Sequence, residues 1–368
     1  MSLPIIDRLE ARGAVRLDLP LLQPAEPFLE LAGEDLRRRV FLAEDVRGRL
    51  RCLRPELTIP AARAHIEAGR RGPVRYALAG TVFRQRDGAD EFPQAGIETI
   101  GGPSAEEDAR ALTDAIVLVD DLAPTRRAEV VVGDRAIYRA ALHAIGLPDA
   151  WLARLMRVHG DPNGSDAAFP DHAQRSAPEV GFGADPSLPD DLDDALKRND
   201  RVGVEAAIAA AIIRTRMGKG VRTPAEVAAR LLERHELSGP GPTDAQRSTV
   251  RSLSDLACPF DAVPESLAAV GLDPGSLSDP LDQHRKRIDA LRGSGVDPAA
   301  LTFRAGLGRP LDYYTGLIFE IRDAAGTVLA AGGRYDRLLG LLGGAEEPAV
   351  GFALWLDRLG VNLDGSAR

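Results

Sequence analysis

The first third of the chain consists of short apolar runs separated by polar turns, a pattern typical of strands joined by short connections. The run RVFLAEDVRGRLRCL at 39–53 predicts a hairpin that turns at Asp45 to Gly48. RYALAGTVFRQR at 75–86 and FPQAGIETIGG at 92–102 predict two further strands, joined by a polar loop. The periodicity changes at 106–122, where EEDARALTDAIVLVDDL is typical of a helix, and AEVVVGD at 128–134 predicts one more strand.

From about residue 135 to 302 the pattern becomes helical. Segments 136–147 and 150–160 predict a helical hairpin, and one long alanine-rich helix is expected from Asp194 to Met217. Thr223 to Glu226 forms a capping box that opens another helix at 225–237. The segment 160–191 is rich in Pro, Gly, Ser and Asp, so we expect a long loop there.

Strand-like runs return after Phe303. They occupy RPLDYYTGLIFEI at 309–321, GTVLAAGGRYDRL at 326–338 and EPAVGFALWLDRLGVNL at 347–363. Because the expected strands follow each other through short turns, the sheet should be antiparallel. We therefore predict an α+β fold whose core, 1–134 and 301–368, is interrupted by a mostly helical insertion at 135–300 with its loop at 160–191.

Composition narrows the classes of partner. The formal net charge is −9, and an acidic balance makes nucleic-acid binding unlikely. The longest apolar runs, at 115–119 and 206–213, are too short for a membrane span, and the N-terminus lacks the features of an export signal. Cys52 and Cys258 indicate reduced thiols in a cytoplasmic protein, and no histidine or cysteine spacing predicts a metal site.

Two other patterns, glycine-rich stretches and an acidic run, do not predict a phosphate-binding or catalytic site. The glycines in GLGRPLDYYTG and AAGGRYDRL do not form a strand-turn-helix phosphate loop, so they predict turns. The acidic run Glu106, Glu107, Asp108 begins an amphipathic helix, where carboxylates suit the helix dipole or the solvent. We assign it no catalytic role.

Five segments occur in a specific order: LRPELT (53–58), GTVFRQRDGADEFPQAGIE (80–98), RPLDYYTG (309–316), AGGRYD (331–336) and GFALWLDRL (351–359). The residues of these segments and their order along the chain closely resemble the catalytic core of histidyl-tRNA synthetase, a class II aminoacyl-tRNA synthetase. The resemblance implies an antiparallel sheet flanked by helices, a helical insertion and self-association as a dimer. Only nine residues follow Leu359, so the anticodon-binding domain of the synthetase is not expected.

The same resemblance implies a site for L-histidine and no cofactor. It assigns Glu56 and Thr58 to the amino group of the ligand, and Gln94 and Arg309 to its carboxylate. These pairings make physical sense, since an ammonium needs acceptors and a carboxylate suits an arginine fork.

The imidazole of the ligand would lie among Glu98, Tyr314 and Tyr335, with Tyr313 beside them. A glutamate and a tyrosine hydroxyl can together read two ring nitrogens. The alternative is that these segments only build the sheet and its turns.

The departures from the synthetase pattern concern ATP. Arg84 stands where class II enzymes hold the α-phosphate, but Arg86 replaces the glutamate that reads the adenine amine. Trp355 occupies the place of a small glycine, while Arg358, the usual triphosphate ligand, remains. These four residues therefore read as a relic nucleotide site.

A synthetase core that keeps a histidine pocket and loses its ATP-reading groups is similar to the family of ATP phosphoribosyltransferase regulatory subunits. That resemblance implies a chain without catalysis of its own. It would assemble with a short catalytic subunit into a hetero-octamer and confer feedback inhibition by histidine in the first step of histidine biosynthesis. The alternatives are a truncated histidyl-tRNA synthetase-like enzyme and a synthetase-like sensor of RNA or amino acids.

Overall fold

The chain folds into two compact units. The first comprises Met1–Ala144, His159–Pro162 and Ser252–Arg368, and the second Ile145–Val158 and Asn163–Arg251. The second unit is narrower than the expected insertion at 135–300, because the chain after residue 252 contributes a strand and helices to the first unit. The computed structural model describes residues 3–31, 34–86, 88–161, 190–198, 200–215, 241–308 and 313–368, with isolated positions between 164 and 237.

Nine described strands form the main sheet of the first unit, in the order β1-β5-β6-β12-β11-β10-β7-β9-β8. The central strands from β5 to β7 are antiparallel throughout, as predicted. Parallel pairing occurs only toward the edges, between β1 and β5 and between β7 and β9. The bounds are β1 Val15–Arg16, β5 Val74–Phe83, β6 Glu91–Ile100, β7 Arg127–Asp134, β8 Ala257–Pro259, β9 Thr302–Arg304, β10 Leu317–Asp323, β11 Val328–Arg334 and β12 Ala349–Trp355.

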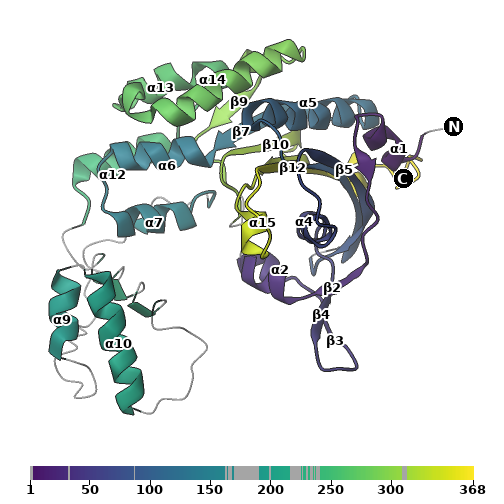
Figure 1. The fold of residues 1–368 in the computed structure, drawn as a ribbon. Helices are drawn as coiled ribbons and strands as arrows, with labels where there is room; N and C mark the ends of the chain where they lie inside the picture. The colour runs from purple at the N-terminus through teal and green to yellow at the C-terminus, as the bar shows by residue number, and fades with distance from the viewer. Residues whose placement is uncertain are drawn as a thin grey trace. The chain divides into compact units, whose positions relative to one another are not determined.

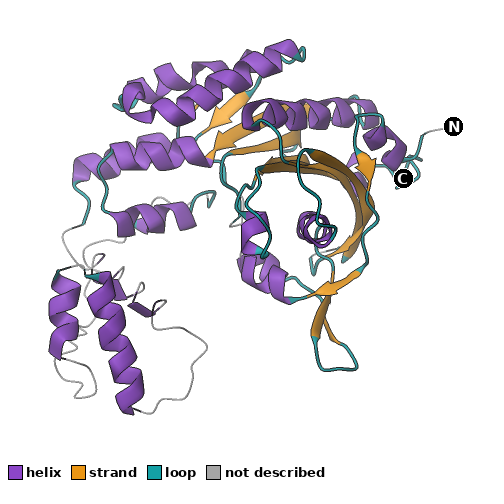
Figure 2. Ribbon diagram, in the orientation of Figure 1, coloured by secondary structure: helices purple, strands orange, loops and turns teal. Residues whose placement is uncertain are grey.

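Helices cover both faces of this curved sheet. On one face the sheet bends around α4, with α2 and α15 beside it, and on the other face lie α5 and α14 (Figures 1 and 2). Helix α5 begins where Gly101 and Gly102 adopt positive φ angles, which turn the chain sharply after β6. The bounds are α1 Ile5–Glu10, α2 Glu26–Leu31, α3 Glu34–Arg37, α4 Thr58–Glu67, α5 Ser104–Leu122, α6 Arg135–Ala144, α12 Asp244–Ser254, α13 Val263–Ala269, α14 Ser278–Gly293, α15 Leu338–Leu341 and α16 Leu356–Leu359.

A second, small sheet carries the predicted hairpin. Strand β4 (Leu50–Leu53) pairs antiparallel with both β2 (Leu22–Pro24) and β3 (Leu42–Glu44). Asp45 shapes the turn, because its Oδ1 accepts the backbone N–H groups of Arg47 (2.9 Å) and Arg49 (3.0 Å). The hairpin prediction is therefore confirmed, with its turn at the expected residues.

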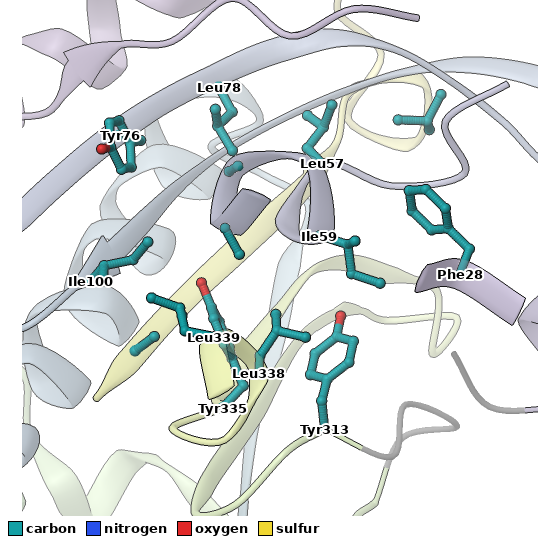
Figure 3. Close-up of a cluster of buried hydrophobic side chains, with 14 of the residues drawn as sticks. Phe28, Leu57, Ile59, Tyr76, Leu78, Ile100, Tyr313, Tyr335, Leu338 and Leu339 are labelled. Atoms are coloured by element: carbon teal, nitrogen blue, oxygen red, sulfur yellow. The ribbon is translucent and has the colours of Figure 1, made fainter. Parts of the chain in front are cut away.

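The core on the α4 face is a cluster of apolar and aromatic side chains. It includes Phe28 from α2, Ile59 from α4 and Leu78 from β5. Tyr313 and Tyr335 stand in the same cluster close to Leu338 (Figure 3). Two tyrosines inside an apolar core need hydrogen-bond partners for their hydroxyl groups. Polar groups must therefore lie on this face of the sheet, as a binding site requires.

The opposite face buries a network of charges. Asp108 of α5 accepts hydrogen bonds from Arg287 of α14 (2.6 Å) and Arg334 of β11 (2.7 Å), and Arg287 also donates to Asp134 (2.6 Å). Asp108 is fully buried. Our expectation that this carboxylate faces solvent or only the helix dipole is wrong, because two arginines from distant segments neutralise it.

The second unit is helical where it is described. Helices α7 (Asp149–Arg157), α9 (Asp190–Lys197) and α10 (Arg201–Thr215) form there. The single helix expected from Asp194 is broken, because Asp200 accepts the backbone N–H of Gly203 (3.0 Å) and caps a new helix. The capping box at Thr223, and nearly all of the loop predicted at 160–191, lie outside the described residues.

Candidate functional site

A cavity opens on the α4 face of the sheet, at the middle of β6, β11 and β12. All seven described residues that the sequence assigns to histidine binding line it, whereas Arg309 lies outside the described residues. Four separate segments of the chain are thereby brought to one place. The seven are Glu56, Thr58, Gln94, Glu98, Tyr313, Tyr314 and Tyr335.

Glu56 is fixed at the start of α4. Its two carboxylate oxygens accept the backbone N–H groups of Thr58 (2.6 Å) and Ile59 (2.9 Å), two of the donors that a helix N-terminus leaves unpaired. Burial raises the pKa of Glu56, and the same hydrogen bonds oppose that shift. Glu56 thus has a structural role in the helix, and its carboxylate still borders the cavity.

Glu98 of β6 is the hydrogen-bonding centre of the cavity. Thr58 Oγ1 donates to its Oε1 (2.6 Å), and the hydroxyl of Tyr335 donates to its Oε2. Burial raises the pKa of Glu98 to about 8, an effect that the charge of Glu56 reinforces and the two hydrogen bonds oppose. Thr58 and Tyr335 therefore hold the carboxyl group of Glu98 in one orientation.

Two glycines make room for this arrangement. A Cβ on Gly351 of β12 would lie 1.6 Å from Glu98 Oε2, and one on Gly96 of β6 would lie 1.8 Å from the carbonyl oxygen of Phe352. No side chain can occupy either position without moving its neighbour. Gly351 in particular allows Glu98 to lie flat across the neighbouring strand.

Gln94 has a buried amide that lacks a partner. It is 1% exposed, and no described group accepts a hydrogen bond from its Nε2. A buried donor without an acceptor costs free energy, which favours a ligand atom at that point. Gln94 thus offers a donor to an anionic or carbonyl group in the cavity.

Three tyrosine rings form one wall. The rings of Tyr313 and Tyr335 meet edge to face with centroids 5.8 Å apart, and Tyr313 and Tyr314 lie 5.2 Å apart. Gly333 gives Tyr314 its place, because a Cβ there would lie 2.9 Å from the ring. This wall is apolar apart from its hydroxyl groups, as expected for a pocket that holds a flat ring.

The four residues of the relic nucleotide site divide into two pairs. Arg84 and Trp355 line the cavity, whereas Arg86 and Arg358 do not. Arg86 pairs with Asp357 (2.9 Å) and lies 3.7 Å over the ring of Phe92. Arg358 donates to the carbonyl oxygen of Val328 (2.7 Å). Both outer arginines are thus engaged by the protein itself.

Sequence reasoning missed several residues of the cavity, and two of them carry its chemistry or its shape. Arg39 lines it, although an arginine run normally predicts a solvated surface. Gly351 was noticed only as part of a motif, and its packing against Glu98 requires the strand register, in which Gly351 stands opposite Glu98. No local pattern signals either role.

Within the described part of the chain, no three His, Cys, Asp or Glu side chains are grouped to hold a metal ion. None of the described helices combines the length and apolar character that crossing a membrane requires.

The comparisons with known proteins agree with this geometry. The family model described as histidyl-tRNA synthetase matches residues 4–167 and 180–359. A solved structure described as an ATP phosphoribosyltransferase regulatory subunit/histidyl-tRNA synthetase from Bacillus halodurans superposes with a TM-score of 0.63 at 19% identity, covering 98% of this chain and 76% of that one. Histidyl-tRNA synthetase from Nostoc gives 0.61 at 15% identity, covering 96% and 68%. These likenesses establish the class II synthetase fold.

The relatives identified by sequence show the family as well as the fold. The ATP phosphoribosyltransferase regulatory subunit of Allorhizobium ampelinum is 45% identical, over 96% of this chain and 95% of its own length. The protein of the same name from Brucella canis is 42% identical, over 95% and 94%. Identity of this extent across nearly the whole length shows the family. The chain belongs to the ATP phosphoribosyltransferase regulatory subunits, built on a histidyl-tRNA synthetase-like core.

Proposed function

We propose that this regulatory subunit binds L-histidine in the cavity and transmits its presence to a short catalytic ATP phosphoribosyltransferase subunit, which is thereby inhibited. The observation that carries the proposal is one cavity that contains an oriented carboxyl group, Glu98, and an unpartnered buried amide, Gln94. The chain itself would perform no catalysis. Its two free cysteines suit a cytoplasmic role.

The cavity offers a complement to each part of a histidine zwitterion. The Gln94 amide can donate to the carboxylate of the ligand, where Arg309 is also expected. Glu56 can accept from the ammonium group through its remaining lone pairs, and Thr58 can accept at its hydroxyl oxygen. Glu98 and Tyr335 can meet the imidazole nitrogens, with the rings of Tyr313 and Tyr314 beside them.

Regulation without catalysis is supported by the state of the nucleotide residues. Arg86 presents a cation where adenine recognition needs an acceptor, and its charge is held by Asp357. Trp355 stands opposite Gln94 in the neighbouring strand, lines the cavity and is 5% exposed. A nucleotide base would have to displace this ring.

Allosteric inhibition requires that histidine bind the active and inhibited complexes with different affinities. Coupling of this kind is typically about 1–3 kcal/mol, or a 5- to 150-fold change in affinity. Self-association of the chain as a dimer and assembly into a hetero-octamer remain predictions. Both can be measured when the chain is reconstituted with the catalytic subunit.

The experiment is reconstitution with the catalytic subunit and titration with histidine. Glu98→Gln should relieve inhibition while assembly, followed by light scattering, stays intact. Glu91→Gln is the matched control, because Glu91 is an exposed glutamate on the same strand. If Glu98→Gln is inhibited as strongly as the parent protein, histidine does not act through this cavity.

A synthetase-like enzyme is the second candidate, and one observation favours it. Arg84, which occupies the α-phosphate position of the synthetase pattern, lines the cavity beside the expected amino-acid site. Such an enzyme must bind ATP and catalyse histidine-dependent pyrophosphate exchange. The regulatory proposal expects neither.

A further inference from the structure

A second hollow lies next to the cavity, between α6, α14 and the chain around α15. We call it the basic groove. Its volume is about 980 Å³, at the upper end of the range for small-molecule pockets and large enough for a segment of polypeptide. Helices α6 and α14 lie side by side along it (Figure 1). The charged side chains that line it are Arg135, Arg139, His143, Lys286, Arg337, Asp279, Asp282 and Asp336.

The groove presents positive charge on an acidic protein. Arg135 and Arg139 follow one another at four-residue spacing and so place two guanidinium groups on one face of α6. Lys286 of α14 adds a cation from the neighbouring helix. Arg139, Lys286 and Arg337 are exposed and form no ion pair with any described residue.

Two of the three acidic residues pair with arginines that do not line the groove. Asp282 pairs with Arg285, and Asp336 accepts from Arg334 Nη1 (2.7 Å), an arginine that also donates to Asp108. Arg139, Lys286 and Arg337 outnumber Asp279 and the shared carboxylate Asp336, so the charge left to attract a partner is positive. In a chain with a formal net charge of −9, this concentration of cations distinguishes the groove.

The groove and the cavity share a wall. Tyr313 and Tyr314 line both of them. The third ring of this wall, Tyr335, donates to Glu98 in the cavity, while the next residue, Asp336, lines the groove and accepts from Thr315 Oγ1 (3.2 Å). A ligand that moves any of the three tyrosines would thereby change the surface of the groove.

We propose that the basic groove is the docking site for an acidic segment of the catalytic partner, and that the shared tyrosine wall couples this docking to the amino acid in the cavity. This inference rests on the proposed function, because it requires a catalytic partner. Charge complementarity selects an acidic segment. Because Tyr313 and Tyr314 line both hollows, a segment docked in the groove would contact side chains that a ligand in the cavity can move.

The test is a double charge reversal, Arg139→Glu with Lys286→Glu, in the full chain. Arg47→Glu with Arg71→Glu is the matched control, because both arginines are exposed, lie outside the groove and give the same change in net charge. Binding of the catalytic subunit is measured by isothermal titration at several salt concentrations. Histidine binding and circular dichroism establish that each variant is folded.

We expect the groove variant to bind the partner at least about tenfold more weakly at low salt, with a smaller salt dependence, and to keep its histidine affinity. The control should bind as the parent does. Equal loss in both variants would show only a general charge effect and overturn the inference. So would unchanged binding by the groove variant, or a groove that binds pyrophosphate while partner binding is unaffected by its charges.

Failure of the proposed function gives a different result. In that case the parent chain itself does not bind the catalytic subunit, and the groove variant has no affinity to lose. The coupling has its own measurement, since histidine and partner must change each other's affinity by the same factor. If histidine and the partner do not change each other's affinity for the parent chain, coupling through the shared tyrosine wall is contradicted.

Discussion

The candidate site has two ends, an expected amino-acid end inside the cavity and an expected nucleotide end that extends past the cavity to Arg86. The two ends differ in whether their polar groups have partners within the protein. At the amino-acid end, Glu98 is oriented by Thr58 and Tyr335, and the Gln94 amide faces the cavity without a protein partner. At the nucleotide end, Arg86 is held by Asp357 and by the ring of Phe92. The first end keeps polar capacity for a ligand, whereas the second uses it within the fold.

Under the proposed function, this difference would let one binding site lose a nucleotide and keep an amino acid on the same strands. Gln94 and Trp355 stand opposite each other in adjacent strands, so residues assigned to the two ends are direct neighbours in the sheet. A buried donor left unpaired costs stability, whereas a paired arginine adds to it. Substitutions at the two ends should therefore have opposite signatures in stability and ligand affinity.

Gly351→Ala should have the largest effect. The added Cβ would meet Glu98 Oε2 at 1.6 Å and force the carboxyl group away from Thr58 and Tyr335. We expect loss of measurable histidine binding and about 2–4 kcal/mol lower free energy of unfolding. Chemical denaturation and calorimetry measure both. Gly293→Ala is the control, since nothing lies within 4 Å of its Cβ position, and a comparable loss there would contradict the explanation.

The pH dependence of stability should come next. The folded chain raises the pKa of Glu98 from 4.5 to about 8, so between these values it retains a proton that the unfolded chain releases. The contribution of Glu98 to stability is therefore fully present below pH 4.5 and is lost as pH rises toward 8. The free energy of unfolding of the parent, minus that of Glu98→Gln, should fall across this window by up to about 1.4 kcal/mol per pH unit. A flat difference would mean that Glu98 is ionised in the folded chain.

Gln94→Met should separate function from stability. It removes a donor that has no partner, so the free energy of unfolding should stay equal or rise by about 1 kcal/mol, while histidine should bind about tenfold more weakly. Gln23→Met is the matched control, because Gln23 is also buried but its Nε2 donates to the carbonyl of Pro20 (2.8 Å). That variant should lose about 1 kcal/mol of stability and keep its histidine affinity.

Arg86→Ala should have the smallest effect. It breaks the ion pair with Asp357, in which both side chains are partly exposed to solvent, and the contact with the ring of Phe92, so a loss of about 0.5–1 kcal/mol is expected. Histidine affinity should not change, because Arg86 does not line the cavity. A large decrease in histidine affinity would show that the two ends are not independent.

Much of the fold could be predicted because its signals are local. The turn at Asp45 and the apolar runs of β5 and β6, which the polar loop between them separates, depend on neighbouring residues alone. The break at Asp200 was missed, because helix propensity in an alanine-rich run outweighed a single capping residue. The burial of Asp108 was also missed, since its partners Arg287 and Arg334 are far away in sequence.

The candidate site followed from a resemblance between ordered motifs, and the structure adds what those motifs do not contain. Glu56 could be named, but its bonds to the start of α4 depend on the helix that follows. The clearance at Gly351 requires the pairing of β6 with β12. The basic groove combines α6 and α14, more than a hundred residues apart, so no segment predicts it alone.

The most direct test of the central claim is calorimetric titration of the isolated chain with L-histidine and, separately, with ATP and Mg²⁺. The difference between the two ends predicts saturable binding of histidine, abolished by Glu98→Gln, and no saturable binding of ATP. Tight ATP binding, or pyrophosphate exchange that depends on histidine, would contradict it.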